Sequence, residues 1–99
     1  MAAYVLAMVE VTDPVKYAEY AKRTPAAIAA FGGKFVIRGG PVEMLEGPEV
    51  NRRFVLIEFP TKEAARGFYQ SAAYQEAKGF RQGAANATFL LLEGWAPPA

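Results

Sequence analysis

Four short stretches of the chain are rich in bulky apolar and β-branched residues, the composition that β-strands prefer. They cover residues 4–11, 34–38, 53–59 and 87–93. Between the first and second stretches, and again between the third and fourth, apolar residues recur every three or four positions, as along one side of an α-helix. The pattern predicts the order strand, helix, two strands, helix, strand.

The first helical region carries signals for its start and for a break. Asp13 is expected to cap the free amide groups, and Pro14 suits the first helical position because its missing N–H is not needed there. Pro25 should split the helix, with Thr24 capping the second piece. The side predicted to face the core consists of Val15, Ala18 and Ala21, with Tyr17 and Tyr20 beside it.

The second helical region is predicted to be broken in the same way. Thr61 is expected to cap its start, and Ser71 to begin a second piece. The apolar side of the first piece consists of Ala64, Ala65, Phe68 and Tyr69, and the second piece carries Tyr74, Ala77 and Arg81 along one side. Between the two middle strands, residues 42–45 are predicted to form a short strand extension.

This order of elements most simply forms a ferredoxin-like α+β fold, a βαββαβ antiparallel sheet with the helices on one face. The 99 residues have room for one core only. We therefore predict a single domain over residues 1–94 and a Pro-rich tail over residues 95–99.

Composition and charge exclude several classes of protein. Eleven basic and ten acidic residues nearly cancel, which argues against a nucleic-acid partner bound through a strongly basic face. The chain has no histidine and no cysteine, which excludes imidazole catalysis and the usual zinc and haem ligands, so we expect no metal and no cofactor. No stretch has transmembrane length or the form of a signal peptide, so we expect a cytoplasmic protein with no membrane partner.

The predicted strands are apolar on both faces, although the helices can cover only one. Such a patch is rarely left exposed on a soluble monomer, and pairing with a second copy would bury it. We therefore predict a homodimer joined through the sheet faces, with Leu56 and Leu91 in the interface. The alternative is that the loops or the tail around Trp95 cover this face.

An ordered set of short motifs resembles one known family. The motifs are Asp13-Pro14 with Tyr17 and Tyr20, Gly32-Gly33-Lys34-Phe35, Arg38-Gly39-Gly40, Glu46-Gly47, Glu58-Phe59-Pro60, and Phe68-Tyr69-Gln70-Ser71 with Tyr74. Together they resemble the DUF1330 family from about residue 4 to residue 94. The resemblance implies a dimeric α+β barrel, a superfamily that also holds antibiotic-biosynthesis monooxygenase-like proteins, haem-degrading enzymes, muconolactone isomerases and stress-responsive dimers. Fold alone does not choose among these functions.

Two charged residues are candidates for chemistry. If Phe35 and Ile37 face the helices, alternation places Arg38 on the other face, where its guanidinium could bind a carboxylate; the alternative is a structural ion pair. Alternation places Glu58 on the same face, where it is the candidate catalytic base; the alternative is neutralisation by Lys34 or Arg38 as part of the dimer interface. Antiparallel pairing of the middle strands should bring Lys34 near Glu58, and Arg38 near Arg53.

Four tyrosines on the predicted helices are candidate ligand-binding residues, with core packing as the alternative. They are Tyr17, Tyr20, Tyr69 and Tyr74. Two hypotheses follow. The protein binds a small organic ligand, such as a carboxylate or an aromatic compound, or acts on it as a cofactor-independent enzyme. Alternatively, it is a non-catalytic structural or stress-associated dimer whose polar residues serve assembly. A cavity of roughly 300 Å³ or more at these residues would favour the first hypothesis.

Overall fold

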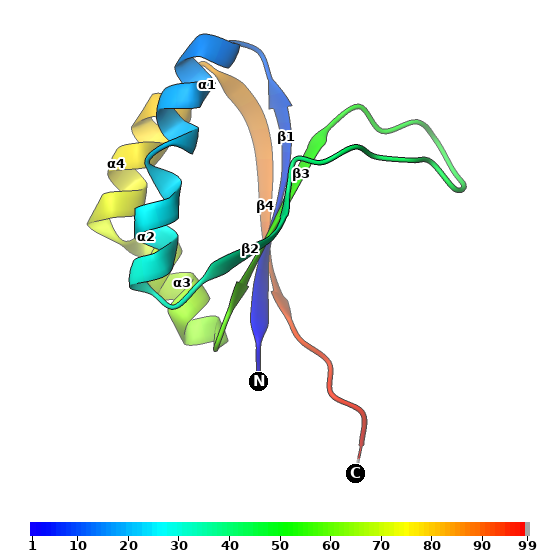
Figure 1. Cartoon of the computed structure of the whole chain (residues 1–99), viewed down its shortest axis with the longest axis vertical. Helices are drawn as coiled ribbons and strands as arrows, with labels where there is room; N and C mark the ends of the chain where they lie inside the picture. The colour runs from blue at the N-terminus through cyan, green and yellow to red at the C-terminus, as the bar shows by residue number, and fades with distance from the viewer. Residues whose placement is uncertain (99) are drawn as a thin grey trace.

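Four strands pair into one antiparallel sheet in the computed structural model of the chain, which describes residues 1–98. They are β1 (Ala3–Val11), β2 (Lys34–Arg38), β3 (Arg53–Phe59) and β4 (Ala85–Glu93). The order across the sheet is β2-β3-β1-β4, so β2 and β4 form its edges. All helices cover one face, as Figure 1 shows. The predicted ferredoxin-like fold is therefore confirmed. Ala99, the last residue of the predicted tail, lies outside the described residues.

Each helical region is divided into two helices by local hydrogen bonding. They are α1 (Pro14–Ala21), α2 (Thr24–Ala30), α3 (Lys62–Gln70) and α4 (Ala72–Arg81). The side chains of Asp13, Thr61 and Ser71 each accept a hydrogen bond from the amide three residues later, at 3.1, 3.0 and 3.1 Å, as predicted. The prediction for Thr24 was wrong. Thr24 is the first residue of α2, and its hydroxyl donates to the Ala21 carbonyl at 3.1 Å.

The core lies between the helices and one face of the sheet. On α4 the predicted stripe of Tyr74, Ala77 and Arg81 is buried. On α1 the predicted stripe was wrong, because Val15 is 82% exposed while Tyr17 and Tyr20 are buried. A tyrosine ring reaches further into the core than an alanine methyl group, so the helix turns its aromatic side inward.

A β-bulge in β2 changes which residues face the helices. Lys34 and Phe35 lie opposite Glu58 and Ile57 of β3, but Ile37 lies opposite Leu56 and Arg38 opposite Val55. The register therefore shifts by one residue between Phe35 and Ile37, which reverses the alternation of side chains. The predicted faces of Arg38 and Ile37 were wrong: Arg38 is on the helix side, and Ile37 is on the outer face.

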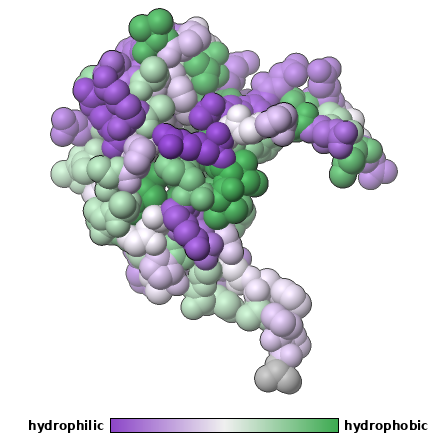
Figure 2. Space-filling view, in the orientation of Figure 1, coloured by the Kyte–Doolittle hydropathy of each residue, from purple (hydrophilic) through white to green (hydrophobic). Residues whose placement is uncertain are grey.

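The outer face of the sheet is apolar, as the alternation predicted. It includes Tyr4, Leu6, Met8, Ile37, Phe54, Leu56, Leu90 and Leu92, all partly or largely exposed. Figure 2 shows hydrophobic atoms exposed along the sheet on the side away from the helices. Leu91 pairs with the core residue Val5, so it lies on the helix side of β4 rather than on the outer face.

The segment between β2 and β3 projects from the domain as a long arm (Figure 1). We use the name arm for residues 40–51, every one of which is exposed. The predicted strand over residues 42–45 was wrong for the single chain, because these residues pair with no strand within residues 1–98.

Candidate functional site

A small cavity lies between the inner face of the sheet and the helices. Its volume is about 30 Å³. It is lined by Ala7, Val9, Tyr17, Tyr20, Ala21, Thr24, Ile28, Phe35, Arg38, Arg53, Val55, Ile57, Phe68 and Phe89. A cavity of this size holds about one water molecule, whereas ligand pockets start at roughly 300 Å³. Arg38, Tyr17 and Tyr20 thus surround a nearly closed interior rather than an open ligand pocket.

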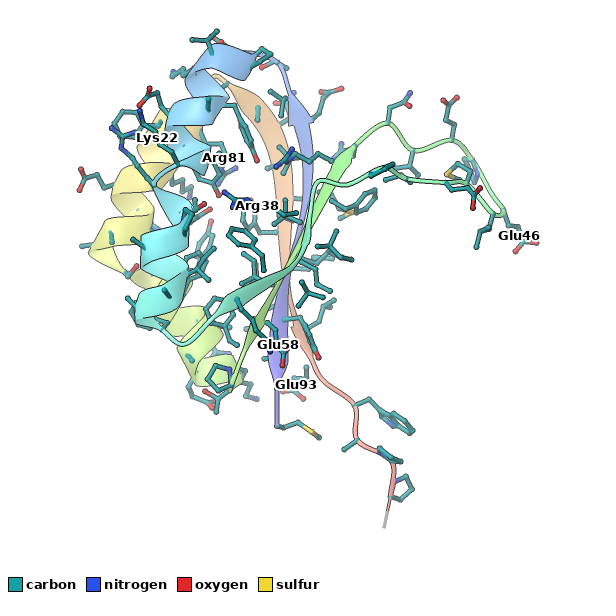
Figure 3. The ribbon with its side chains drawn as sticks, in the orientation of Figure 1. Lys22, Arg38, Glu46, Glu58, Arg81 and Glu93 are labelled. Atoms are coloured by element: carbon teal, nitrogen blue, oxygen red, sulfur yellow. The ribbon has the colours of Figure 1, made fainter. Side chains whose placement is uncertain are left out.

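Arg38 bridges the edge of the sheet and the end of α1. Its guanidinium carbon lies 4.2 Å from the centre of the Phe35 ring, and its Nη2 donates to the Ala21 carbonyl at 3.3 Å. The residue is exposed on one side and lines the cavity on the other. Figure 3 shows its side chain directed into the space between the sheet and the helices. Arg38 therefore forms part of the wall that separates the cavity from solvent.

Arg53, the first residue of β3, supplies a second guanidinium to the same cavity. Its Nε is buried and has no hydrogen-bond partner within the described residues. Gly39 has a φ of +69°, and a Cβ there would collide with the Arg53 guanidinium. A glycine at this turn thus leaves room for Arg53. Arg53 was predicted as a neighbour of Arg38 but not as a site residue. Alternation along β3 could have identified it, because it places Arg53 on the same side as the core residues Val55 and Ile57.

A third arginine lies deeper, beside two hydrogen-bonded tyrosines. The hydroxyl oxygens of Tyr20 and Tyr74 are 2.9 Å apart and buried. Arg81 is only 8% exposed, and its guanidinium carbon lies 4.6 Å from the Phe89 ring centre and 5.4 Å from that of Tyr20. Its Nε has no hydrogen-bond partner within the described residues. Figure 3 shows Arg81 and Arg38 directed into the same region of the interior.

The positive charge of these arginines is not balanced locally. No aspartate or glutamate is among the described residues that line the cavity. The ion pairs within residues 1–98 join Glu19 to Lys22 and Arg23, Glu58 to Lys34, and Glu93 to Lys62. Buried or partly buried charges are normally paired. The three guanidiniums of Arg38, Arg53 and Arg81 therefore create a region that favours an anion.

Glu58 does not belong to this region. It lies on the outer face, opposite Tyr4 of β1 and Lys34 of β2, and its Oε1 is 3.9 Å from the Lys34 ammonium. The predicted proximity of Lys34 and Glu58 is confirmed. The prediction that Arg38 and Glu58 share a face was wrong, because the bulge in β2 places the sheet between them.

The four tyrosines divide between two places. Tyr17 and Tyr20 line the cavity, and Tyr74 reaches it only through its hydrogen bond to Tyr20. Tyr69 is half-buried and packs against Phe89, with ring centres 5.9 Å apart. It lines a separate pocket between α3 and β4. The structure thus brings Arg38, Tyr17 and Tyr20 together and leaves Tyr69 outside.

The buried tyrosine pair predicts a loss of stability in alkali. Burial raises the pKa of the Tyr20 hydroxyl well above its ordinary value of 10.0, and the adjacent Tyr74 adds to the rise. Burial also raises the pKa of Tyr74, against the opposing effects of its hydrogen bond to Tyr20 and the charge of Arg81. Above about pH 10 the unfolded chain releases protons that the folded chain retains, so the free energy of unfolding should fall as pH rises.

Urea unfolding at several values between about pH 9 and 11 measures this slope. Tyr20→Phe should make the decline with pH shallower, even if it lowers stability at every pH. The control is Ile28→Val, which removes a buried methyl group but no titratable group and should leave the slope unchanged. Equal slopes for the wild type and Tyr20→Phe would contradict the assignment.

Two kinds of feature are absent from residues 1–98. No three or more His, Cys, Asp or Glu side chains gather where they could hold a metal ion. None of the helices there combines the length and the apolar character needed to cross a membrane.

Comparison with solved structures shows the same fold in several proteins. The protein of unknown function RPA0582 from Rhodopseudomonas palustris has a TM-score of 0.77 and 24% identity, over 97% of this chain and 84% of its own. SnoaB, a cofactor-independent oxygenase from Streptomyces nogalater, has a TM-score of 0.65 and 15% identity, over 97% and 95%. A dimeric ferredoxin-like protein of unknown function from Jannaschia sp. CCS1 has a TM-score of 0.64 and 15% identity, over 95% and 100%.

At these identities the structural matches establish the fold and no residue roles. A search among curated proteins finds no match. Residues 2–95, nearly the whole chain, match one sequence family. The chain belongs to the family described as Domain of unknown function (DUF1330).

Proposed function

We propose that the protein is a homodimer that binds a small organic carboxylate between the sheet and the helices, with Arg38 and Arg53 as its anchors. One observation carries this proposal. Two guanidinium groups line the same cavity, whose other described lining residues are mostly aromatic or apolar and include no carboxylate. A carboxylate ligand would supply the missing counter-charge through two parallel hydrogen bonds. Tyr17 and Tyr20 would contact the apolar part of the ligand.

Binding requires the cavity to open, since about 30 Å³ does not admit an organic acid. Arg38 is suited to this movement. It is exposed, and the one hydrogen bond that its guanidinium makes within residues 1–98 is long, at 3.3 Å, to the Ala21 carbonyl. Exchanging this carbonyl for a charged carboxylate gives a stronger hydrogen bond, so the ligand itself would favour the open arrangement.

The apolar outer face supports the homodimer. This face would be an unusually large hydrophobic surface for a monomer. The ferredoxin-like neighbour from Jannaschia is itself described as dimeric. Face-to-face packing would place Glu58 and its ion pair with Lys34 at the edge of the interface. We assign Glu58 to assembly there, because a catalytic base at this position would lie across the sheet from the proposed ligand.

The second candidate is a non-catalytic dimer with a structural or stress-associated role. The small volume of the cavity favours this second candidate, because the interior leaves no room for an organic ligand unless the cavity opens. The fold leaves both candidates open, since SnoaB is a cofactor-independent oxygenase and other neighbours have unknown functions. A cytoplasmic location and the absence of nucleic-acid and membrane partners stay predictions.

A thermal-shift comparison tests the ligand. A series of aromatic and short-chain carboxylates should raise the melting temperature of the wild type, because a ligand that binds the folded state stabilises it. Arg38→Ala and Arg53→Ala should each lose about 1.5–3 kcal/mol of binding free energy, the usual value of a hydrogen bond to a charged group. This weakens binding about tenfold or more.

The matched control is Lys22→Ala, which removes an exposed cation near the cavity that already pairs with Glu19. It should leave the thermal shifts unchanged. The corresponding amides, which carry no negative charge, should give no shift. If no carboxylate stabilises the wild type, or if the arginine variants respond as the wild type does, the protein is not a carboxylate-binding protein of this kind.

A further inference from the structure

Arg81, the last residue of α4, places a cation in the interior of the domain. Its side chain is only 8% exposed, and its Nε is buried without a hydrogen-bond partner within the described residues. None of the ion pairs within residues 1–98 includes it. The rings of Phe89 and Tyr20 lie beside its guanidinium, but a ring centre accepts no ordinary hydrogen bond from Nε. Arg81 therefore has a buried charge and a buried donor for which the described chain supplies no counter-ion.

The tyrosine pair beside Arg81 adds a further donor. The hydroxyl groups of Tyr20 and Tyr74 carry two protons, and the hydrogen bond of 2.9 Å between them uses one. No other hydrogen bond within residues 1–98 involves either hydroxyl, so the second proton has no acceptor there. We use the name inner pole for Arg81, Tyr20 and Tyr74. The inner pole combines a positive charge with unused donors, which suits a negatively charged oxygen.

The inner pole lies across the sheet from the arginines of the proposed carboxylate site. Arg53 of β3 pairs with Val9 of β1, whereas Phe89, which lies beneath Arg81, belongs to β4 and pairs with Ala7 of β1. Because β1 lies between β3 and β4, the two positions are two strand spacings apart, or about 10 Å. Ala7 and Val9 lie between them and line the cavity with apolar groups. Figure 3 shows Arg38 and Arg81 directed into this same space.

We propose that the ligand is an aromatic acid with two acidic groups, a carboxylate and a phenol, and that the inner pole binds the phenol oxygen as a phenolate. An aromatic ring with the two groups at opposite ends spans the gap, since each hydrogen bond from a guanidinium adds about 3 Å. The ring then lies on Ala7 and Val9. This inference rests on the proposed function, in which Arg38 and Arg53 bind the carboxylate of the same ligand.

A phenolate fits the inner pole better than a neutral acceptor does. A water molecule fits the resting cavity of about 30 Å³ and accepts a hydrogen bond, but it brings no negative charge to Arg81. A nearby positive charge favours the ionised form of an acid, so binding should lower the pKa of the ligand's phenol. No carboxylate among the described lining residues opposes this effect. On α1, which packs against α4, Glu19 is already paired with Lys22 and Arg23.

A matched pair of ligands tests the inner pole on the unmodified protein. The probes are 4-hydroxy-3-nitrobenzoate, whose phenolate is coloured, and 3-nitrobenzoate, which lacks only the hydroxyl group. The hydroxylated probe should bind at least about tenfold more tightly, the usual effect of a hydrogen bond to a charged group. At a pH where the free probe is half ionised, adding the protein should increase the absorbance of the phenolate. Calorimetric and absorbance titrations measure the two effects.

Variants of the inner pole assign the effect to its residues. Arg81→Gln and Tyr20→Phe should each reduce the affinity for the hydroxylated probe to that for 3-nitrobenzoate and abolish the rise in absorbance. Binding of 3-nitrobenzoate should stay unchanged, because its carboxylate contacts Arg38 and Arg53. The matched control is Lys78→Gln, which removes a cation from the same last turn of α4, where it lies beside the ring of Tyr69 outside the cavity. It should retain both effects.

The outcomes separate the inner pole from the carboxylate site. Equal affinity of the wild type for the two probes, with no rise in phenolate absorbance, overturns the inner pole and leaves the carboxylate site standing. Arg81 is then a structural cation held by Phe89 and Tyr20. Failure of both probes to bind overturns both proposals. Circular dichroism establishes that the variants fold, and a preference for the hydroxylated probe that persists in folded Arg81→Gln and Tyr20→Phe also overturns the inner pole.

Discussion

Leu56→Arg should convert the proposed homodimer into a monomer. Leu56 lies in β3 on the outer face, between Leu6 of β1 and Ile37 of β2. In a face-to-face dimer the new guanidinium would be buried without a partner, which costs about 3–5 kcal/mol. This weakens association by roughly two to three powers of ten, since each 1.4 kcal/mol is a factor of ten. Light scattering across a dilution series measures the change from twice the chain mass of 10.8 kDa to a single copy.

Val15→Arg is the matched control. Val15 is exposed on α1, on the helix side of the molecule, so the same new charge should leave dimerisation unaffected. Leu91→Arg tests a different surface, because Leu91 lies on the helix side at the edge of β4. A Leu56→Arg protein that remains dimeric at low micromolar concentration would show that the outer face is not the interface.

Phe68→Ala should cause a large loss of stability. Phe68 of α3 is fully buried and packs between Phe59 and Tyr74, with ring centres 5.2 and 4.7 Å away. Removing the ring loses its buried surface and leaves a void, and such changes cost about 3–5 kcal/mol. Urea unfolding at neutral pH, with both proteins at the same concentration, measures the difference in free energy.

The same substitution links the core to the cavity, because Phe68 is one of the residues that line it. Phe68→Ala should enlarge the cavity and allow a small apolar molecule such as benzene to stabilise the variant but not the wild type. Phe68→Leu keeps most of the volume and should lose less stability. Equal stability of Phe68→Ala and the wild type would mean that the aromatic cluster does not pack as described.

The two faces of the sheet therefore have separate proposed functions. The inner face and the helices enclose the arginines and tyrosines of the proposed ligand site. The outer face serves association in the proposed homodimer. Variants of Arg38 and variants of Leu56 should accordingly affect different measurements, the first ligand binding and the second the oligomeric state.

Short-range patterns in the sequence determined much of the fold. The capping residues Asp13, Thr61 and Ser71 act within three residues of themselves, so their roles are readable from their neighbours. Strand alternation in β1 and β3 separates the core face from the outer face over only a few residues. The pairing of Lys34 with Glu58 follows from the antiparallel order of two adjacent strands, and the structure confirms it.

Tertiary structure alone decided the composition of the site. The bulge in β2 depends on how this strand is aligned against β3, and it transferred Arg38 to the helix side, away from Glu58. The rotation of α1 depends on which side chains fill the space above the sheet, and it buried Tyr17 and Tyr20 instead of Val15. Arg38 and Arg53 line one cavity together with Tyr17 of α1, although these residues are far apart in the chain. Such contacts are set by register and packing between elements, which no local pattern of residues specifies.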